Sequence, residues 1–254
     1  MGLEIEVGLE VIGDLPLLYL RQYRTILAAD LHLGFEEEAS EQGYYIPRVQ
    51  YLRAIQLLST ALDLVDADRI VFAGDVKHCF SRLLRSEREE VSKLLSNLQQ
   101  KGIEVVIVRG NHDNFLPIVA RKYGVPILDE YRLGSILIIH GHRKPKNIDD
   151  KIKVIIMGHE HPSIRIKDKL GFITRLPCFL KAPYKGKSLI VLPAIGVYQT
   201  GTTVSLSPST YLSPLLREDV DLRKVKPYVL AEEVGVLEFP ELGVLNELLE
   251  EIAL

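Results

Sequence analysis

Residues with metal-binding side chains gather in five short segments, each directly after an apolar run. Six of the seven histidines lie in these segments, and the seventh, His78, follows Asp75 by three positions. Residues i and i+2 of an extended segment point to the same side, so Asp30 and His32 are placed to bind one ion together. Carboxylate, amide and imidazole donors suit borderline or hard divalent cations, which predicts metal-dependent chemistry. The segments are Asp30-Leu31-His32, Gly74-Asp75, Gly110-Asn111-His112-Asp113, His140-Gly141-His142 and Gly158-His159-Glu160-His161.

Each segment has an ordinary explanation when it is taken alone. Gly74-Asp75 is a common type of turn, and Asn111 and Asp113 are good helix caps. The histidine-rich segments 140–142 and 158–161 could each be structural. The joint occurrence of all five, in order and at the ends of apolar runs, favours a functional site. The glycines in them would let the backbone approach crowded polar groups closely, and the absence of clustered cysteines argues against a structural zinc site.

The elements that must position these segments predict an α/β fold. The apolar runs 69–73, 103–108 and 153–157 do not alternate between apolar and polar residues, which is typical of strands buried on both faces beneath helices. In such folds ligands bind beyond the ends of the strands. We expect further strands at 5–12, 16–21, 24–29 and 135–139 and then up to about Thr203, with helices at 47–64 and 85–100 and a short acidic helix at 240–253.

The order of the five motifs resembles the calcineurin-like metallophosphoesterases. The similarity covers residues 30–161, about half of the chain. Within that family, the Ala29–Gly34 stretch and the Gly-His-Glu-His-Pro stretch are most similar to archaeal phosphoesterases related to the nuclease subunit SbcD and to ligase-associated phosphoesterases. The resemblance implies a four-layer α/β/β/α sandwich formed by a single domain, residues 1–254, with its core motifs at 30–161 and a C-terminal extension at 205–254.

The resemblance also implies a role for each motif residue. Asp75 would bridge two divalent ions, of which Mn²⁺ is favoured and Fe²⁺, Zn²⁺ or Ni²⁺ are alternatives. His112 would be the general acid or transition-state stabiliser, and Asp113 would orient its imidazole. A hydroxide shared by the ions would attack the phosphorus in line. The remaining ligands would be Asp30, His32 and His161 for the first metal and Asn111, His140 and His159 for the second.

Other polar residues are candidates for contact with the substrate. Many relatives have an acidic residue three positions after the bridging aspartate, whereas this chain has His78, which could contact a metal ligand or the substrate or could have no role in the site. Asn111 is a second candidate. Arg143, Lys144 and Lys146 could contact substrate phosphates, or they could form a solvated charged loop. We do not expect His142 to be a ligand.

Three functions fit these features. The first is a phosphodiesterase that acts on nucleotides or nucleic acid, the second is a phosphomonoesterase, and the third is a non-catalytic scaffold. Every expected ligand position is filled, which disfavours the scaffold, and the nuclease-like resemblance favours the diester. The net charge is −3, and seven acidic residues with no Lys or Arg follow Lys226. Such a tail would repel DNA, so small or single-stranded diesters fit better than long duplexes.

The composition indicates a globular protein. The chain has 254 residues, of which 47% are hydrophobic and 26% charged, and no segment is long and apolar enough to span a bilayer. Two cysteines cannot form a disulfide framework, which favours a reducing cytoplasm. We therefore expect a cytoplasmic protein without a membrane contact. The sequence leaves open whether it forms a homodimer or has a protein partner.

Overall fold

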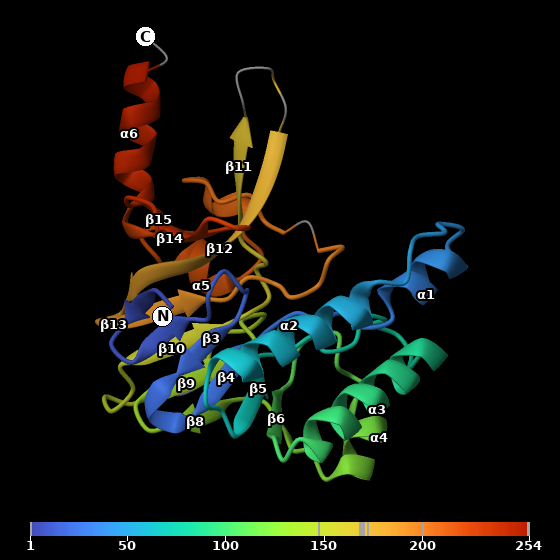
Figure 1. Ribbon diagram of the computed structural model, residues 1–254. Coiled ribbons are helices and arrows are strands. Elements are labelled where there is room, and N and C mark those ends of the chain that lie inside the picture. Colours follow the sequence, from blue (N-terminus) through green and yellow to red (C-terminus); the bar gives the residue numbers. More distant parts are fainter. Residues whose placement is uncertain (1, 147, 168–170, 172, 200, 253–254) are drawn as a thin grey trace.

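The computed structural model describes residues 2–252, apart from 147, 168–170, 172 and 200, as two stacked β-sheets with helices on their outer faces (Figure 1). The first sheet has the order β1-β2-β3-β4-β5-β6-β7. Its strands are β1 Glu4–Glu6, β2 Leu9–Val11, β3 Leu18–Leu20, β4 Thr25–Ala28, β5 Arg69–Phe72, β6 Glu104–Val108 and β7 Ile127–Leu128. Strands β4 to β7 are parallel, so the loops after them leave from the same edge of the sheet.

The second sheet has the order β15-β14-β12-β13-β10-β9-β8, with β11 paired to β12. Its parallel centre is formed by β9, β10 and β13, and the other pairings are antiparallel. The C-terminal part of the chain contributes β14 and β15 to this sheet. Its strands are β8 Tyr131–Leu133, β9 Ile136–Ile139, β10 Val154–Met157, β11 Ser163–Lys167, β12 Ile173–Tyr184, β13 Lys187–Val191, β14 Lys226–Ala231 and β15 Gly235–Glu238.

Apolar side chains on both faces of the strands produce the layers. On β4, Ile26 packs into the core beneath the helices α2 (Gln50–Leu64) and α3 (Arg85–Gln100), whereas its neighbour Leu27 packs into the core between the sheets. On β10, Ile156 faces the first sheet and Ile155 faces the outer layer that contains α5 (Pro214–Glu218). The expected four-layer α/β/β/α arrangement is therefore confirmed.

Two short helices and one long one complete the chain. Helix α1 (Phe35–Glu41) lies beside the start of α2, and helix α4 (Pro117–Ala120) packs beside α3. Helix α6 (Leu242–Ile252) ends the described chain and corresponds to the acidic helix expected at 240–253. The β11–β12 hairpin and α6 extend from the same end of the molecule (Figure 1). No helix in the described part of the chain combines the length and the apolar character that a bilayer crossing requires.

The predicted elements need three corrections. The expected single strand 5–12 is a hairpin, because Gly8 takes a left-handed φ of 76° and reverses the chain between β1 and β2. Helix α2 begins at Gln50 rather than at Pro47, and the Glu36 carboxylate accepts hydrogen bonds from the first amides. The strands expected up to Thr203 end at Val191, and residues 192–199 instead cross the strand ends beside the candidate site.

Candidate functional site

The five polar segments meet where β4, β5, β6, β9 and β10 end. The backbone there is unusual. The described chain has eight non-glycine residues with positive φ, and five of them belong to these segments. Left-handed backbone costs a residue with a Cβ on the order of 1 kcal/mol, and such strain persists where function requires it. The five are Asp30 (58°), His32 (47°), Asp75 (53°), His159 (68°) and His161 (46°).

One group of potential ligands consists of Asp30, His32 and His161. A donor atom from each lies within 4.8 Å of the others. His161 Nε2 is 3.3 Å from Asp30 Oδ1 and 3.4 Å from His32 Nε2. Asp30 Oδ1 is buried and accepts no well-formed hydrogen bond from the described residues, whereas Oδ2 accepts one from the His159 amide at 2.9 Å. A buried carboxylate oxygen without a donor fits a cation-binding position.

A second group consists of Asp75, His140 and His159, again with donor atoms within 4.8 Å. His140 Nε2 lies 3.2 Å from Asp75 Oδ2 and 3.0 Å from Asn111 Oδ1. Its other nitrogen, Nδ1, is 2.9 Å from the Ala73 carbonyl oxygen, which orients the ring. The structure thus brings Asn111 to the group in which the sequence predicted it.

Asp75 lies between the two groups. Its Oδ2 atom is 3.2 Å from His140 Nε2 and 3.9 Å from His32 Nε2. Its Oδ1 atom accepts a hydrogen bond of 2.9 Å from the His112 amide. Asp75 therefore has a carboxylate oxygen near a histidine nitrogen of each group.

Two glycines explain how so many side chains fit together. A Cβ on Gly110 would lie 2.0 Å from Asp75 Oδ1, and one on Gly158 would lie 2.8 Å from Asp30 Oδ2. Both contacts are far shorter than van der Waals distance. The sequence prediction of close backbone approach is confirmed at these positions.

The crowded charges change the acidity of the site. Burial by itself would raise the pKa of Asp75, but the charge of His140 and a hydrogen bond from it hold that pKa below its usual range. Burial lowers the pKa of His140, but Asp75 and Asp30 outweigh it and raise the value to about 9. Burial and the neighbouring His140 lower the pKa of His159 to about 4. The site therefore combines the Asp75 carboxylate with closely packed imidazoles, and a divalent cation that binds there would displace the proton that His140 otherwise holds.

Asp113 has a different position from the one expected. Its buried carboxylate accepts hydrogen bonds from the amides of Gly110, Asp75, Val76 and Lys77, at 2.9 to 3.3 Å. Burial and the charge of Asp75 raise its pKa to about 6. It therefore joins the loops that follow β5 and β6, and it does not orient the His112 ring.

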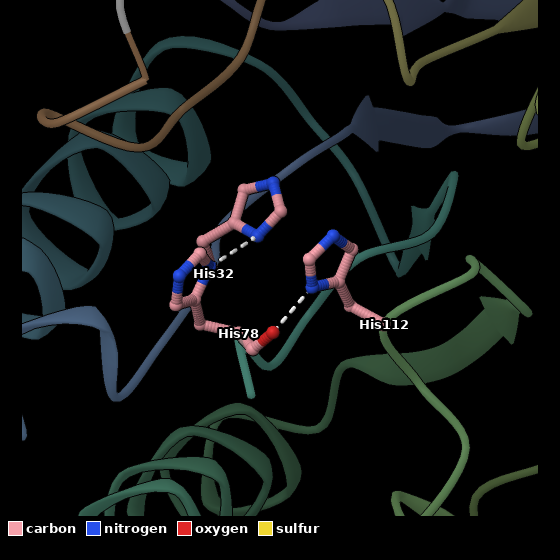
Figure 2. Close-up of side chains that lie close together, drawn as sticks. All are labelled: His32, His78 and His112. Atoms are coloured by element: carbon pink, nitrogen blue, oxygen red, sulfur yellow. Dashed lines mark hydrogen bonds between the residues drawn. The ribbon is translucent and has the colours of Figure 1, made fainter. Parts of the chain in front are cut away.

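The His112 ring is oriented by a main-chain carbonyl instead. Its Nδ1 atom hydrogen-bonds to the carbonyl oxygen of His78 (Figure 2). This contact leaves Nε2 as the nitrogen that is available for proton transfer. The rings of His78 and His112 lie nearly parallel, with centroids 5.4 Å apart.

His78 completes a third cluster, with His32 and His112 (Figure 2). Its Nδ1 atom is 3.1 Å from His32 Nδ1, and its Nε2 atom is 3.4 Å from Glu38 Oε2. Burial and the charge of His112 lower the pKa of His78 to about 4. The structure thus places His78 directly beside the first ligand group.

The basic residues after His142 divide into two kinds. Arg143, Lys144 and Lys146 all line a cavity that reaches His140, and Arg143 also donates a hydrogen bond of 2.8 Å to His142 Nε2. Lys144 differs from the other two because it forms ion pairs of 2.9 Å with Glu218 and Asp219 in the C-terminal part of the chain. Arg143 thus remains a candidate substrate contact.

Several residues that were not predicted from the sequence form hydrogen bonds to the backbone of the site segments. The buried Glu160 carboxylate accepts hydrogen bonds from the amides of Leu212 and Ser213, and Ser213 Oγ donates to the Gly141 carbonyl. Glu87 accepts from the His78 amide, and Gln50 donates to the Leu31 carbonyl. Their partners lie between 9 and 72 positions away, so no short motif marks them.

The comparisons with known proteins agree with this geometry. A family model described as calcineurin-like phosphoesterase matches residues 23–163. The structure is similar to that of the nuclease MPE from Pseudomonas putida, with a TM-score of 0.65 and 20% identity over 94% of this chain and 99% of that one. A protein of unknown function from Aquifex aeolicus matches with a TM-score of 0.36 and 17% identity over 54% of this chain and 78% of its own. None of the curated proteins has a significant sequence match.

Proposed function

Because this chain belongs to the calcineurin-like phosphoesterase family, we propose that it is a phosphodiesterase that uses two divalent cations and acts on nucleotides or nucleic acid. One observation carries the proposal. Asp75 belongs to the second group, yet its Oδ2 atom lies within 3.9 Å of a histidine nitrogen from each group, His32 in the first and His140 in the second. A single carboxylate that is shared by two ligand groups is the arrangement a two-cation hydrolase needs.

The proposed ligands follow from the two groups. Bound cations would supply a water of lowered pKa and positive charge beside the phosphoryl oxygens. Mn²⁺ is the favoured ion, because the donors mix carboxylate, amide and imidazole, and Fe²⁺, Zn²⁺ or Ni²⁺ would suit the same set. The first group would hold one cation with Asp30, His32 and His161, and the second would hold another with Asn111, His140 and His159.

The other site residues act on the substrate. His112 would give a proton from Nε2 to the leaving oxygen, since its Nδ1 atom is engaged by the His78 carbonyl. Asp113 would fix the two loops on which Asp75 and His112 lie. Arg143 would meet a phosphate oxygen, and His78 would contact the substituent of the phosphate.

The preference for a diester rests on the similarity to the nuclease MPE from Pseudomonas putida. The test is hydrolysis of bis(p-nitrophenyl) phosphate beside p-nitrophenyl phosphate, with metal-stripped protein and added Mn²⁺. We expect metal-dependent release of p-nitrophenol, with a higher kcat/KM for the diester. A higher kcat/KM for the monoester would identify a phosphomonoesterase, and no turnover with any divalent ion would indicate a scaffold.

A further inference from the structure

A second cavity lies beside the site, next to His78. It encloses about 310 Å³ between helix α1, the loop that follows it and the segment that contains Tyr198. We call it the aromatic pocket. The lining residues that matter here are Phe35, Glu38, Tyr44, Ile46, His78 and Tyr198.

One wall of the aromatic pocket is a fixed pair of rings. Phe35 and Tyr198 stack with their centroids 5.2 Å apart and their planes at 16°. The Tyr198 hydroxyl donates a hydrogen bond to the Pro47 carbonyl, which holds that ring in place. Tyr44 lines the same cavity while 68% of its surface is exposed. The Phe35 and Tyr198 rings are therefore already fixed before a ligand binds, and binding would not need to order them.

The pocket is continuous with the candidate catalytic site. The rings of Phe35 and His78 have their centroids 4.7 Å apart. On its other side, His78 Nδ1 is 3.1 Å from His32 Nδ1, in the first ligand group (Figure 2). A phosphodiester at the ligand groups would therefore place one of its two substituents at the mouth of the pocket.

The charge of the pocket excludes a phosphate as its occupant. None of the described residues that line it is Lys or Arg. Glu38 lines it, and Glu36, Glu37 and Glu41 lie on the same short helix. An anion would be repelled there, whereas an uncharged planar ring would gain stacking and apolar contact.

We propose that the aromatic pocket binds one nucleobase, unstacked from its neighbours, on the substituent of the phosphodiester being cleaved. This rests on the proposed phosphodiesterase function and narrows its substrate to nucleotides and single-stranded nucleic acid. A base within a duplex is stacked on both sides and does not present its faces. Stacking of one base on aromatic side chains contributes about 1–3 kcal/mol, which corresponds to roughly 5- to 150-fold in affinity.

Two diesters with the same leaving group test the proposal. Thymidine 5′-(p-nitrophenyl phosphate) carries a base, and ethyl p-nitrophenyl phosphate does not. With the Mn²⁺-loaded full chain we expect kcat/KM to be higher for the thymidine ester. Tyr44→Ala should lower the ratio of the two kcat/KM values about tenfold. Tyr45→Ala is the matched control, because Tyr45 is 87% exposed and is absent from the lining of the pocket, and it should leave the ratio unchanged.

The outcomes separate this proposal from the one it rests on. If the unaltered protein hydrolyses the ethyl ester but gains nothing from the thymidine, the base pocket is refuted and the phosphodiesterase stands. The same conclusion follows if Tyr44→Ala lowers both kcat/KM values in equal proportion, or if Tyr45→Ala changes the ratio as much as Tyr44→Ala. If neither ester is hydrolysed with any divalent ion, both proposals are wrong.

Discussion

The loops at the strand ends and the entrance segment, residues 35–49, face the same substrate position in opposite ways. Asp30 and Asp75 are 0% and 2% exposed, and backbone amides fix one oxygen of each. Tyr44 and Tyr45 are 68% and 87% exposed. The difference indicates a division of labour. The carboxylates proposed to bind cations are buried and held in one geometry by hydrogen bonds. The tyrosines near the proposed substrate position lie at the surface, where substitutions do not disturb the packing of the sheets.

The largest expected effect comes from the most constrained residue, Asp75. Asp75→Ala should remove the carboxylate that lies between the two ligand groups and lower kcat/KM for bis(p-nitrophenyl) phosphate by more than about 10³-fold. It should also lower the metal content measured by inductively coupled plasma mass spectrometry. Asp63→Ala, on the exposed face of α2, is the control and should retain both the activity and the metal content of the parent protein. Two tightly bound ions in the Asp75 variant would remove this residue from the bridging position.

A smaller effect is expected at His112, which we propose contacts the substrate and does not bind a metal ion. His112→Ala should lower kcat about 10²- to 10⁴-fold and leave the metal content unchanged, because we place its ring on the substrate and outside the two ligand groups, although its centroid lies 5.0 Å from that of His32. Single-turnover kinetics and metal analysis of the same sample check this. His142→Ala, the nearby histidine that is no expected ligand, should change kcat far less. Loss of metal from the His112 variant would contradict its proposed role.

The polar residues at the strand ends could be predicted from the sequence because each motif directly follows its own apolar run. Parallel strands bring such ends together whatever the rest of the chain does. The role that the resemblance implied for Asp113 differs from its contacts, because the turn geometry does not bring its carboxylate to the His112 ring. Asp113 instead accepts amide hydrogen bonds from residues 75–77, which are distant in sequence.

The structure of the entrance segment could not be predicted from the sequence, because its residues carry no local pattern. Helix α1 has seven residues, three of them consecutive glutamates, and it lacks the apolar periodicity that predicts a helix. Its position depends on tertiary contacts, in which Glu36 binds the start of α2 and Gly34 donates to Glu90 Oε2. The pairing of Phe35 with Tyr198, across 163 positions, has no sequence signature at all.

The smallest expected effect concerns the stability of the entrance segment and its dependence on pH. Burial and the charge of Glu36 raise the pKa of Glu90 to about 7 from an ordinary value of 4.5. The folded protein therefore holds a proton that the unfolded chain releases, so stability falls as the pH rises from about 4.5 to about 7. Glu90→Gln keeps an acceptor for the Gly34 amide and removes the charge. We expect it to match the parent protein near pH 4.5 and to be more stable by about 1 kcal/mol at pH 8, after allowance for partial solvent screening.

Urea denaturation at pH 5 and pH 8 measures this difference in the free energy of unfolding. The control is Glu89→Gln, one position earlier on α3, whose carboxylate is exposed and pairs with Arg85. Removal of that charge should give no gain that grows with pH, because the pKa of Glu89 is lowered by its hydrogen bond with Arg85. An equal gain for Glu90→Gln at both pH values would show that Glu90 is already ionised at pH 5, which contradicts a raised pKa in the folded protein.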